Sequence, residues 1–225
     1  EKITENTAAI FINSPMNPTG IVLEESFMKE VSQLGVPVIS DEIYHGLVYE
    51  GKAHSILEYT DNAFVLNGFS KRFAMTGLRL GYLIAPKQYM PAIQKLAQNF
   101  LICASSTAQK AGIAALRDTS DYEQTMFNTY NERRLYLVDR LQKMGFTLPA
   151  IPQGAFYVFV DASKYTNDSL KFAFDVLEKA HVGITPGVDF GTGGEGFVRF
   201  SYANSLENIK EGMDRLEKYI RTVRS

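Results

Sequence analysis

The chain has 225 residues, of which 45% are hydrophobic and 21% charged, and its formal net charge at pH 7 is −2. These values are typical of a soluble globular protein with one large domain, or one domain and a smaller one, around a sizeable core. The sequence has no stripe of basic residues that could neutralise the phosphates of a nucleic acid. No apolar run approaches the roughly 20 residues of a membrane span. The single Cys103 excludes an internal disulfide and a multi-cysteine metal site.

The N-terminal part of the chain has the pattern of an α/β sheet. Three nearly continuous apolar runs, at residues 8–12, 36–39 and 63–66, are typical of parallel strands covered on both faces. Apolar residues at helical spacing predict a helix over residues 24–34, between the first two runs. Strand, helix and strand in this order predict a right-handed crossover. A fourth apolar run, at residues 80–85, predicts one more strand.

Helices are predicted for the middle of the chain. Residues from about 86 to 116 are expected to form two of them, the second through residues 108–116. The first has an apolar face made of Met90, Ile93, Leu96, Ala97 and Phe100. Residues 121–144 predict a longer helix, which we interpret as a connector between two domains.

The C-terminal part has the pattern of a small α+β unit. Residues 155–160 and 197–202 predict strands, and residues 170–180 predict a helix between them. Asn204, with Glu207 three positions on, has the pattern of a capping box that opens a final helix.

These elements predict two domains joined by a helix. Residues 1–118 are expected to form part of a large α/β domain, residues 119–144 the connecting helix, and residues 145–225 a small α+β domain. The chain begins at Glu1 without an initiator Met, and a strand-like run follows almost at once. We therefore expect it to be the C-terminal part of a longer protein. Because the sequence has no signal peptide and no apolar run of membrane-spanning length, we also expect a cytoplasmic enzyme.

Polar residues follow each of the first three predicted strands. The first strand leads into residues 13–20, the second into residues 40–45 and the third into residues 67–72. In α/β sheets, ligands bind beyond the carboxyl ends of the strands. An acid, an amine, a phenol, an amide and a hydroxyl are therefore expected to converge, which favours a site for a charged small molecule.

Lys71 is the central residue of this expected site. A lysine directly after a buried strand can be partly desolvated, and its amine is then a better nucleophile. Taken alone, such a lysine is usually an ordinary surface residue. Asp41 alone fits a helix N-cap, Tyr44 alone fits a core or surface aromatic, and Arg79 and Arg199 alone fit surface charges.

Three motifs together resemble one known family. SKRFAMTGLRLG at residues 70–81 resembles the lysine signature of class I and II aminotransferases. NPTG at residues 17–20 resembles the NPTG turn of that family, and DEIY at residues 41–44 resembles its DE-x-Y segment. The order and spacing also agree, from the first strand to the last helix. The chain is thus similar to aminotransferases of fold type I, in the aspartate aminotransferase superfamily, which depend on pyridoxal 5′-phosphate (PLP).

The resemblance implies a fold and a set of cofactor contacts. The fold would be a three-layer α/β/α PLP-transferase-like domain, with a partial and mostly parallel sheet, followed by a small α+β domain. Lys71 would hold PLP as a Schiff base and then move a proton between substrate and cofactor. Asp41 would pair with the pyridinium nitrogen, and Tyr44 and Asn17 would hydrogen-bond the phenolate oxygen.

The remaining implied contacts concern anions. Ser70 and Arg79 would hold the cofactor phosphate, and Arg199 would bind the α-carboxylate of the substrate. The spacing of the histidines suits no metal site, and no metal is expected.

The resemblance implies transfer of an amino group between an amino acid and a 2-oxo acid, in a homodimer. Two alternatives stay open: a relative with different chemistry, such as a β-C–S lyase or an aminocyclopropane-carboxylate synthase, or the PLP-binding effector domain of a transcription regulator. Full-length relatives carry a further N-terminal segment, so the resemblance also implies that the chain is truncated and, by itself, inactive or impaired. Arg199 recognises a group common to all amino acids, so the sequence does not name the substrate.

Overall fold

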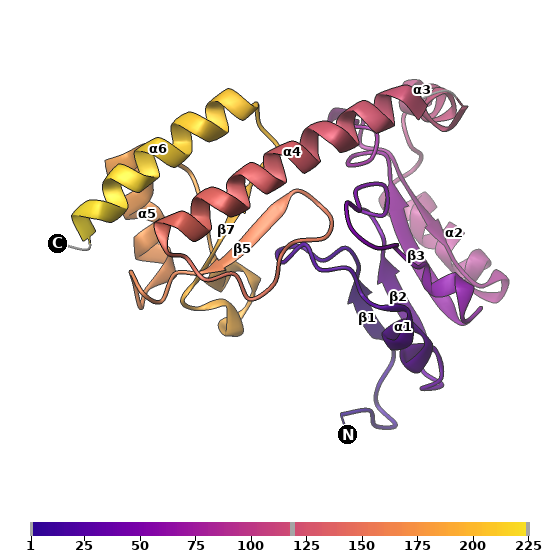
Figure 1. The fold of residues 1–225 in the computed structure, drawn as a ribbon. Coiled ribbons are helices and arrows are strands. Elements are labelled where there is room, and N and C mark those ends of the chain that lie inside the picture. Colours follow the sequence, from indigo (N-terminus) through magenta and orange to yellow (C-terminus); the bar gives the residue numbers. More distant parts are fainter. Residues whose placement is uncertain (1, 118–119, 224–225) are drawn as a thin grey trace. The chain divides into compact units, whose positions relative to one another are not determined.

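The computed structural model describes residues 2–117 and 120–223 (Figure 1). The chain forms two compact units. The first comprises Glu1–Pro15 and Val22–Gln124, and the second comprises Met16–Ile21 and Thr125–Ser225. The short segment Met16–Ile21 thus belongs to the second unit, although in the sequence it interrupts the first unit. The domain limits predicted from the sequence stay a proposal.

The first unit contains a four-stranded sheet with the strand order β1-β2-β3-β4. The strands are β1 (Ile10–Asn13), β2 (Val38–Asp41), β3 (Ala63–Gly68) and β4 (Gly81–Ile84). The first three are parallel, as predicted, and β4 is antiparallel to β3. Asn13 pairs with Asp41, and Asp41 pairs with Leu66, so the carboxyl ends of the parallel strands lie at one edge.

One face of this sheet packs on helix α1 (Glu25–Ser32). Met28 and Val31 of α1 are buried among the following side chains of the strands and of a nearby turn: Ile12, Val38, Ile56, Ala63 and Val65. The other face is more open, since Phe11 is 62% exposed. The expectation that both faces are covered is therefore not met within the part of the chain that the structure describes.

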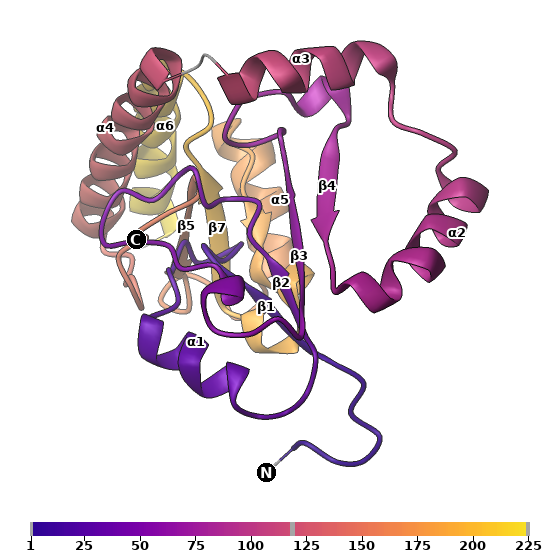
Figure 2. The same cartoon turned by 90° about the vertical axis from the view of Figure 1, so that its right-hand side faces the viewer.

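Helices α2 (Met90–Phe100) and α3 (Ser106–Arg117) follow β4, and α2 lies to the right of β4 in Figure 2. The helices form where the sequence predicts them. However, no residue of α2 is buried, and the three positions Phe100, Leu101 and Ile102 are 79%, 75% and 82% exposed. The apolar face of α2 therefore has no covering element among the described residues.

The second unit is built around a three-stranded antiparallel sheet with the order β5-β7-β6. Its elements are most of α4 (Ser120–Met144), then β5 (Tyr157–Asp161), α5 (Ser169–Ala180), β6 (Thr185–Pro186), β7 (Phe197–Ser201) and α6 (Leu206–Val223). Short 3-10 turns occur in the two units at Ile56–Glu58, Thr76–Leu78, Lys87–Tyr89, Gly187–Phe190 and Thr192–Gly194. Strand β6 was not predicted, because two residues give no measurable periodicity.

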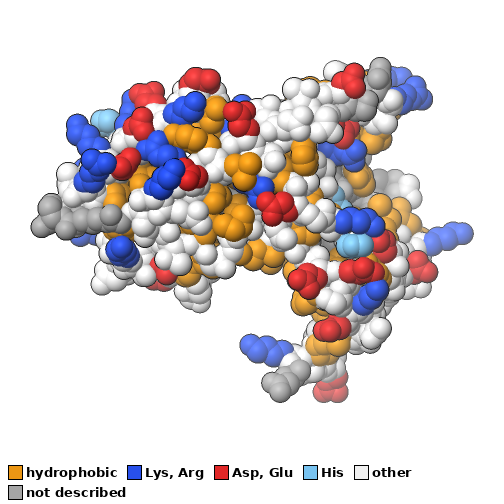
Figure 3. All heavy atoms as spheres, viewed as in Figure 1, with side chains coloured by type: hydrophobic (Ala, Val, Ile, Leu, Met, Phe, Trp, Pro, Cys, Tyr) orange, Lys and Arg blue, Asp and Glu red, His pale blue; other side chains and the backbone are white. Residues whose placement is uncertain are grey.

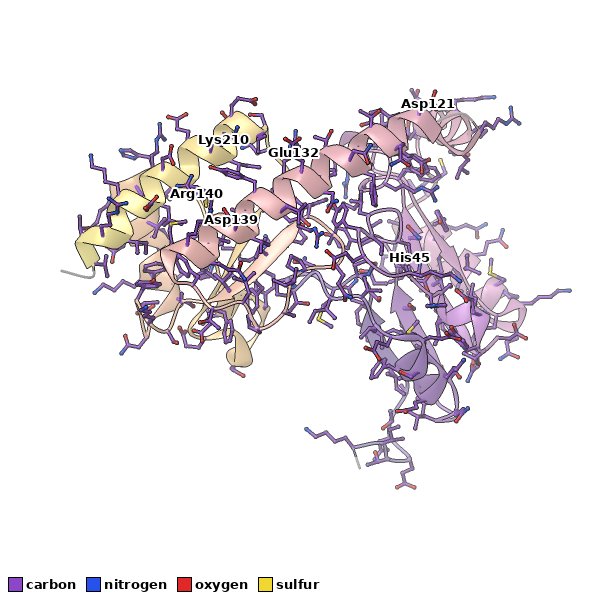
Figure 4. The ribbon with its side chains drawn as sticks, viewed as in Figure 1. His45, Asp121, Glu132, Asp139, Arg140 and Lys210 are labelled. Carbon is purple, nitrogen blue, oxygen red and sulfur yellow. The ribbon has the colours of Figure 1, made fainter. Side chains whose placement is uncertain are left out.

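The core of the second unit consists of apolar side chains from its helices and strands. Those with an exposed fraction of at most 1% include Leu137, Leu141, Val158, Val198, Leu216 and Ile220. Arg140 of α4 pairs with Asp214 at 2.8 Å and with Glu217 at 3.1 Å, both on α6, and Figure 4 shows it on the α4 ribbon. Acidic and basic side chains are interspersed over α4 and α6 on the face drawn in Figure 3.

The start of α6 differs from the prediction by one residue. Ser205 is the residue whose side chain accepts from the N–H of Asn208, at 3.2 Å. Asn204 Oδ1 instead accepts from the N–H of Ser205 at 2.8 Å and from Asn208 Nδ2 at 2.9 Å. Because the helix begins at Leu206, the third helical position is Asn208 rather than Glu207. The predicted Asn204–Glu207 capping box was wrong.

Within the described residues, no helix is both long enough and apolar enough to span a membrane.

Candidate functional site

The candidate residues fall into two groups, one in each unit. The first group lies at the carboxyl edge of the parallel strands. Asp41 is the last residue of β2, and Ser70 and Lys71 come directly after β3. Arg79 precedes β4, whose first residue, Gly81, pairs with Gly68 at the end of β3. Since β4 runs antiparallel, its beginning lies at the same edge, so this edge carries all of these side chains.

The Lys71 amine lies beside an aromatic ring. Its Nζ is 5.8 Å from the ring centroid of Tyr44, within the range of a cation–π interaction. Tyr44 is only 4% exposed, and Lys71 is half-buried. Tyr44 follows Asp41 by three positions, so the amine is held against the segment that leaves the neighbouring strand.

Asp41 has one carboxylate oxygen engaged and one available. Its Oδ1 accepts a hydrogen bond from the N–H of Ile43 at 3.1 Å, which is an Asx turn rather than the helix N-cap considered from the sequence. Its backbone carbonyl accepts from Asn13 Nδ2 at 2.9 Å. Within the described residues, Oδ2 accepts no side-chain or backbone hydrogen bond. It is therefore free to accept a hydrogen bond from a ligand N–H.

Glu42 is a buried carboxylate to which the sequence analysis gave no role. Its Oε1 accepts from Ser40 Oγ at 3.1 Å, from Ser55 Oγ at 3.0 Å and from the N–H of Ile56 at 3.1 Å. Its Oε2 lies 3.3 Å from His45 Nδ1. Burial lowers the pKa of His45, and the nearby Glu42 carboxylate opposes this effect. Glu42 thus anchors the segment that carries Asp41 and Tyr44.

Ser70 and Arg79 are the candidate anion contacts of the first group. Ser70 is half-buried and Arg79 is exposed. The backbone of Arg79 is left-handed, with a φ of 52°, which is uncommon for a residue other than glycine. Its Nη1 donates to the carbonyl of Thr76 at 2.9 Å, and this contact leaves other guanidinium N–H groups available to an anion.

The second group is centred on Arg199 of β7. Its Nη1 donates to Asn17 Oδ1 at 2.7 Å, and its Nη2 donates to Thr185 Oγ1 at 3.1 Å. The guanidinium carbon lies 4.2 Å from the ring centroid of Tyr157 and 4.9 Å from that of Phe190. Its Nε is buried and makes no hydrogen bond. The guanidinium is thus held in a fixed orientation, with donor capacity left for a carboxylate.

The contact between Asn17 and Arg199 was not predicted. The sequence assigned Asn17 to the cofactor and Arg199 to the substrate, and the structure joins the two side chains. Asn17 belongs to a closed turn, in which the N–H of Met16 donates to the Ile21 carbonyl at 2.9 Å and the N–H of Gly20 donates to the Met16 carbonyl at 2.7 Å. The turn fixes the acceptor that Arg199 uses.

Gly20 allows this turn to pack closely against residues 152–154 of the same unit. Its φ is +71°, and a Cβ at this position would lie 2.5 Å from Pro152 Cβ and 2.9 Å from the Gly154 carbonyl oxygen. The N–H groups of Gln153 and Gly154 both donate to the Gly20 carbonyl, at 2.9 and 2.8 Å. Both the backbone conformation and the close approach therefore require glycine here.

We expect Gly20→Ala to destabilise the second unit more than a glycine substitution that changes only backbone strain. Gly196, in the same unit, has a φ of +81° and only an ordinary contact of 3.7 Å to Ser163 Cβ. Gly196→Ala should cost about 1–2 kcal/mol for the left-handed backbone. Gly20→Ala should cost about 1–3 kcal/mol more for overpacking. Urea unfolding measures both, and equal losses in the two variants would contradict the close packing at Gly20.

Comparison with known proteins places the chain in a family. A family model described as aminotransferase class I and II matches residues 1–216. The chain belongs to this family, whose members depend on PLP, and the family assignment made from the sequence is confirmed.

Curated relatives match nearly the whole chain. It is 40% identical over 225 residues to the (5-formylfuran-3-yl)methyl phosphate transaminase of Methanocaldococcus jannaschii, a match that covers 98% of this chain and 60% of that protein. It is 41% identical over 226 residues to an aspartate aminotransferase of Pyrococcus horikoshii, covering 97% of this chain and 58% of that protein. The chain thus spans a little under two thirds of the length of these relatives.

Solved structures share the fold. The crystal structure of an aromatic aminotransferase from Pyrococcus horikoshii matches with a TM-score of 0.95 and 35% identity, over 99% of this chain and 62% of that one. The structure of an aspartate aminotransferase from Thermotoga maritima matches with a TM-score of 0.90 and 36% identity, over 98% of this chain and 58% of that one. These matches confirm the predicted fold-type I class. The roles of the individual site residues stay predictions.

Proposed function

We propose that this chain carries the cofactor-binding and substrate-binding residues of a PLP-dependent amino-acid aminotransferase, which moves an amino group between an amino acid and a 2-oxo acid. The observation that carries this proposal is the position of the Lys71 amine, 5.8 Å from the Tyr44 ring, at the sheet edge where Asp41 ends the neighbouring strand. A lone surface lysine would not share an edge with a carboxylate, a phenol and a guanidinium in the family order.

The residues of the first unit suit the chemical groups of PLP. Oδ2 of Asp41 is available to accept from a protonated ring nitrogen, and Ser70 and Arg79 would hold the phosphate at the same edge. Tyr44 would donate to the phenolate oxygen, and the same role stays a prediction for Asn17. When bound, PLP supplies a carbonyl carbon that takes up an amine and an electron-poor ring that stabilises negative charge on the substrate.

Lys71 has two proposed tasks. Its amine would hold the cofactor, and once released it would accept a proton from the substrate Cα and return one during transfer. General acid–base catalysis of this kind contributes about 10²–10⁴-fold to a rate. The carboxylate of Asp41 would keep a proton on the ring nitrogen through a charge-assisted hydrogen bond.

Arg199 would bind the α-carboxylate of the amino acid and of the 2-oxo acid. Its planar guanidinium can meet two carboxylate oxygens at once, which a lysine cannot do. Asn17 and Thr185 fix the plane of the guanidinium by the hydrogen bonds given above. The ring of Tyr157 packs on it, with 4.2 Å between the guanidinium carbon and the ring centroid. Because these contacts exist before any ligand binds, less conformational entropy would be lost on binding.

We also propose that the whole protein is a homodimer, as the family resemblance implies. The exposed apolar positions at the end of α2, 75–82% accessible at Phe100, Leu101 and Ile102, support contact with another polypeptide, because exposed apolar groups of this kind often mark interfaces. The named relatives act on different substrates, so their names do not decide the preferred amino acid of this protein.

The test is amine transfer by the complete product of the gene, with this chain assayed in parallel. The protein is loaded with PLP and a panel of amino acids is added. The visible absorption of the cofactor should fall with a good donor and recover when a 2-oxo acid is added. We expect transfer by the complete product and weak or no transfer by this chain. Release of product in large excess over the cofactor without any 2-oxo acid would favour the lyase alternative, because amine transfer alone stops after one equivalent. No reaction with any amino acid would contradict the proposal.

A further inference from the structure

Arg134 of α4 is a buried arginine outside the candidate site. It is 2% exposed. Its Nε donates to Asn131 Oδ1 at 2.9 Å, and its Nη1 donates to the carbonyl of Pro152 at 2.7 Å. An apolar residue of similar volume often stabilises a core as well as a buried charge does. Packing alone therefore gives no reason for an arginine here, whereas a directed hydrogen bond to one carbonyl does.

The bonded carbonyl begins a path that leads to the proposed substrate arginine. Pro152 is followed by Gln153 and Gly154, whose N–H groups both donate to the Gly20 carbonyl. Gly20 closes the turn of residues 16–21 by its hydrogen bond to Met16. Arg134 therefore fixes the segment that holds this turn in place.

The turn of residues 16–21 presents Asn17 to Arg199. Asn17 Oδ1 is the acceptor for Arg199 Nη1, at 2.7 Å. The other anchor of Arg199, Thr185, lies in β6 and does not belong to the turn. All the residues of this path belong to the second unit, so one compact body contains it from end to end.

We propose that Arg134 is a positioning residue: through the Pro152 carbonyl it holds residues 152–154 against the turn of residues 16–21, and so fixes the Asn17 acceptor that orients Arg199. The inference rests on the proposed function in one respect, that Arg199 binds the substrate carboxylate. The structural half, from Arg134 to the turn, does not depend on it.

The test compares Arg134→Met with Arg140→Met. Arg140 lies on the same helix (Figure 4), is also largely buried, and makes its contacts to α6 rather than to residues 152–154. Both variants lose an arginine that is at least partly buried, Arg140 with 16% of its side chain exposed, so a general loss of stability should affect both. Amide hydrogen exchange at Gln153 and Gly154 should become about tenfold faster in Arg134→Met, since one lost hydrogen bond shifts an opening equilibrium by that order. Arg140→Met should leave it unchanged.

Arg134→Lys tests the same point in a variant that keeps the charge. Its single ammonium can still donate to the Pro152 carbonyl, so exchange at Gln153 and Gly154 should lie between the wild-type and Arg134→Met values. If Arg134→Met does not fold, this variant decides the matter. Exchange that becomes faster in Arg134→Lys by the same factor throughout the second unit, and not specifically at Gln153 and Gly154, would assign Arg134 a packing role and overturn the proposal.

The second measurement is binding of pyruvate, a 2-oxo acid with only a methyl side chain, followed by the Arg199 Nε–Hε NMR signal. The Kd should rise about tenfold in Arg134→Met, again the order expected for one hydrogen bond, and stay at the wild-type value in Arg140→Met. An unchanged Kd with unchanged amide exchange would overturn the proposal. Absence of pyruvate binding in the wild type, with faster exchange in Arg134→Met, would support the positioning of the turn and contradict the proposed role of Arg199.

Discussion

Replacement of Lys71 by alanine is expected to abolish amine transfer and stable retention of PLP. The amine is the group that would both hold the cofactor and move the substrate proton, and no other residue of the first group carries an amine. Loss of the proton-transfer role alone corresponds to about 10²–10⁴-fold in rate. We expect the combined loss to reach the upper part of this range, measured as turnover and as visible cofactor absorption after gel filtration.

Two further variants make this prediction specific. Lys71→Arg keeps the positive charge beside the Tyr44 ring but lacks a nucleophilic amine, because the guanidinium stays protonated. It should be as inactive as Lys71→Ala. Lys52→Ala removes an exposed lysine of the same unit, whose side chain is 71% accessible, and should retain wild-type turnover. Stable visible absorption in Lys71→Ala, with turnover above a tenth of wild type, would contradict the assignment.

Much of the fold could be predicted from the sequence, because its signals are local. The apolar runs predicted all three parallel strands, with bounds shifted by up to two residues at their starts and ends. The shared sheet edge that carries Asp41 and Lys71 followed from one rule, that parallel strands present their carboxyl ends together. Three strands in register were sufficient to place residues 30 positions apart at one site, with no knowledge of the side-chain packing.

The rest depends on contacts between residues that are distant in the sequence. Asn17 and Arg199 are 182 positions apart, and neither carries a signal that names the other. The grouping of Met16–Ile21 with the C-terminal unit depends on the Gly20 carbonyl, which no pattern of side chains reveals. The apolar face of α2 was predicted correctly as a pattern but not as buried surface, because periodicity shows which side of a helix is apolar and not what covers it.

Glu42 was visible in the sequence as part of a motif, but its burial was not predicted. The sequence placed it between Asp41 and Tyr44 and gave it no role, since an acidic residue at the end of a strand is usually solvated. The structure buries it at 3% exposure with three donors on one oxygen. Two of those donors are the hydroxyl groups of Ser40 and Ser55. They would have indicated a buried Glu42 only if their proximity to its carboxylate had been known from the sequence.

The second large effect is expected at Arg199. Arg199→Met should raise the KM for both the amino acid and the 2-oxo acid, because both carry the carboxylate that the guanidinium would bind. Removing one partner of a hydrogen-bonded charge pair costs about 2–5 kcal/mol, so we expect kcat/KM to fall by about 30- to 5,000-fold. Steady-state kinetics with each substrate varied in turn measures this loss.

The cofactor signal separates this effect from that at Lys71. Most of the proposed PLP contacts lie in the first unit, so Arg199→Met should retain visible absorption that Lys71→Ala loses. Arg199→Lys keeps the charge without the planar fork and should recover only part of the loss. Arg221→Met, an exposed arginine of α6 that pairs with Glu217, is the matched control and should behave as wild type. If Arg199→Met left both KM values unchanged, the carboxylate would have to be bound elsewhere, and the hydrogen bond from Arg199 to Asn17 would serve only to join β7 to the turn of residues 16–21.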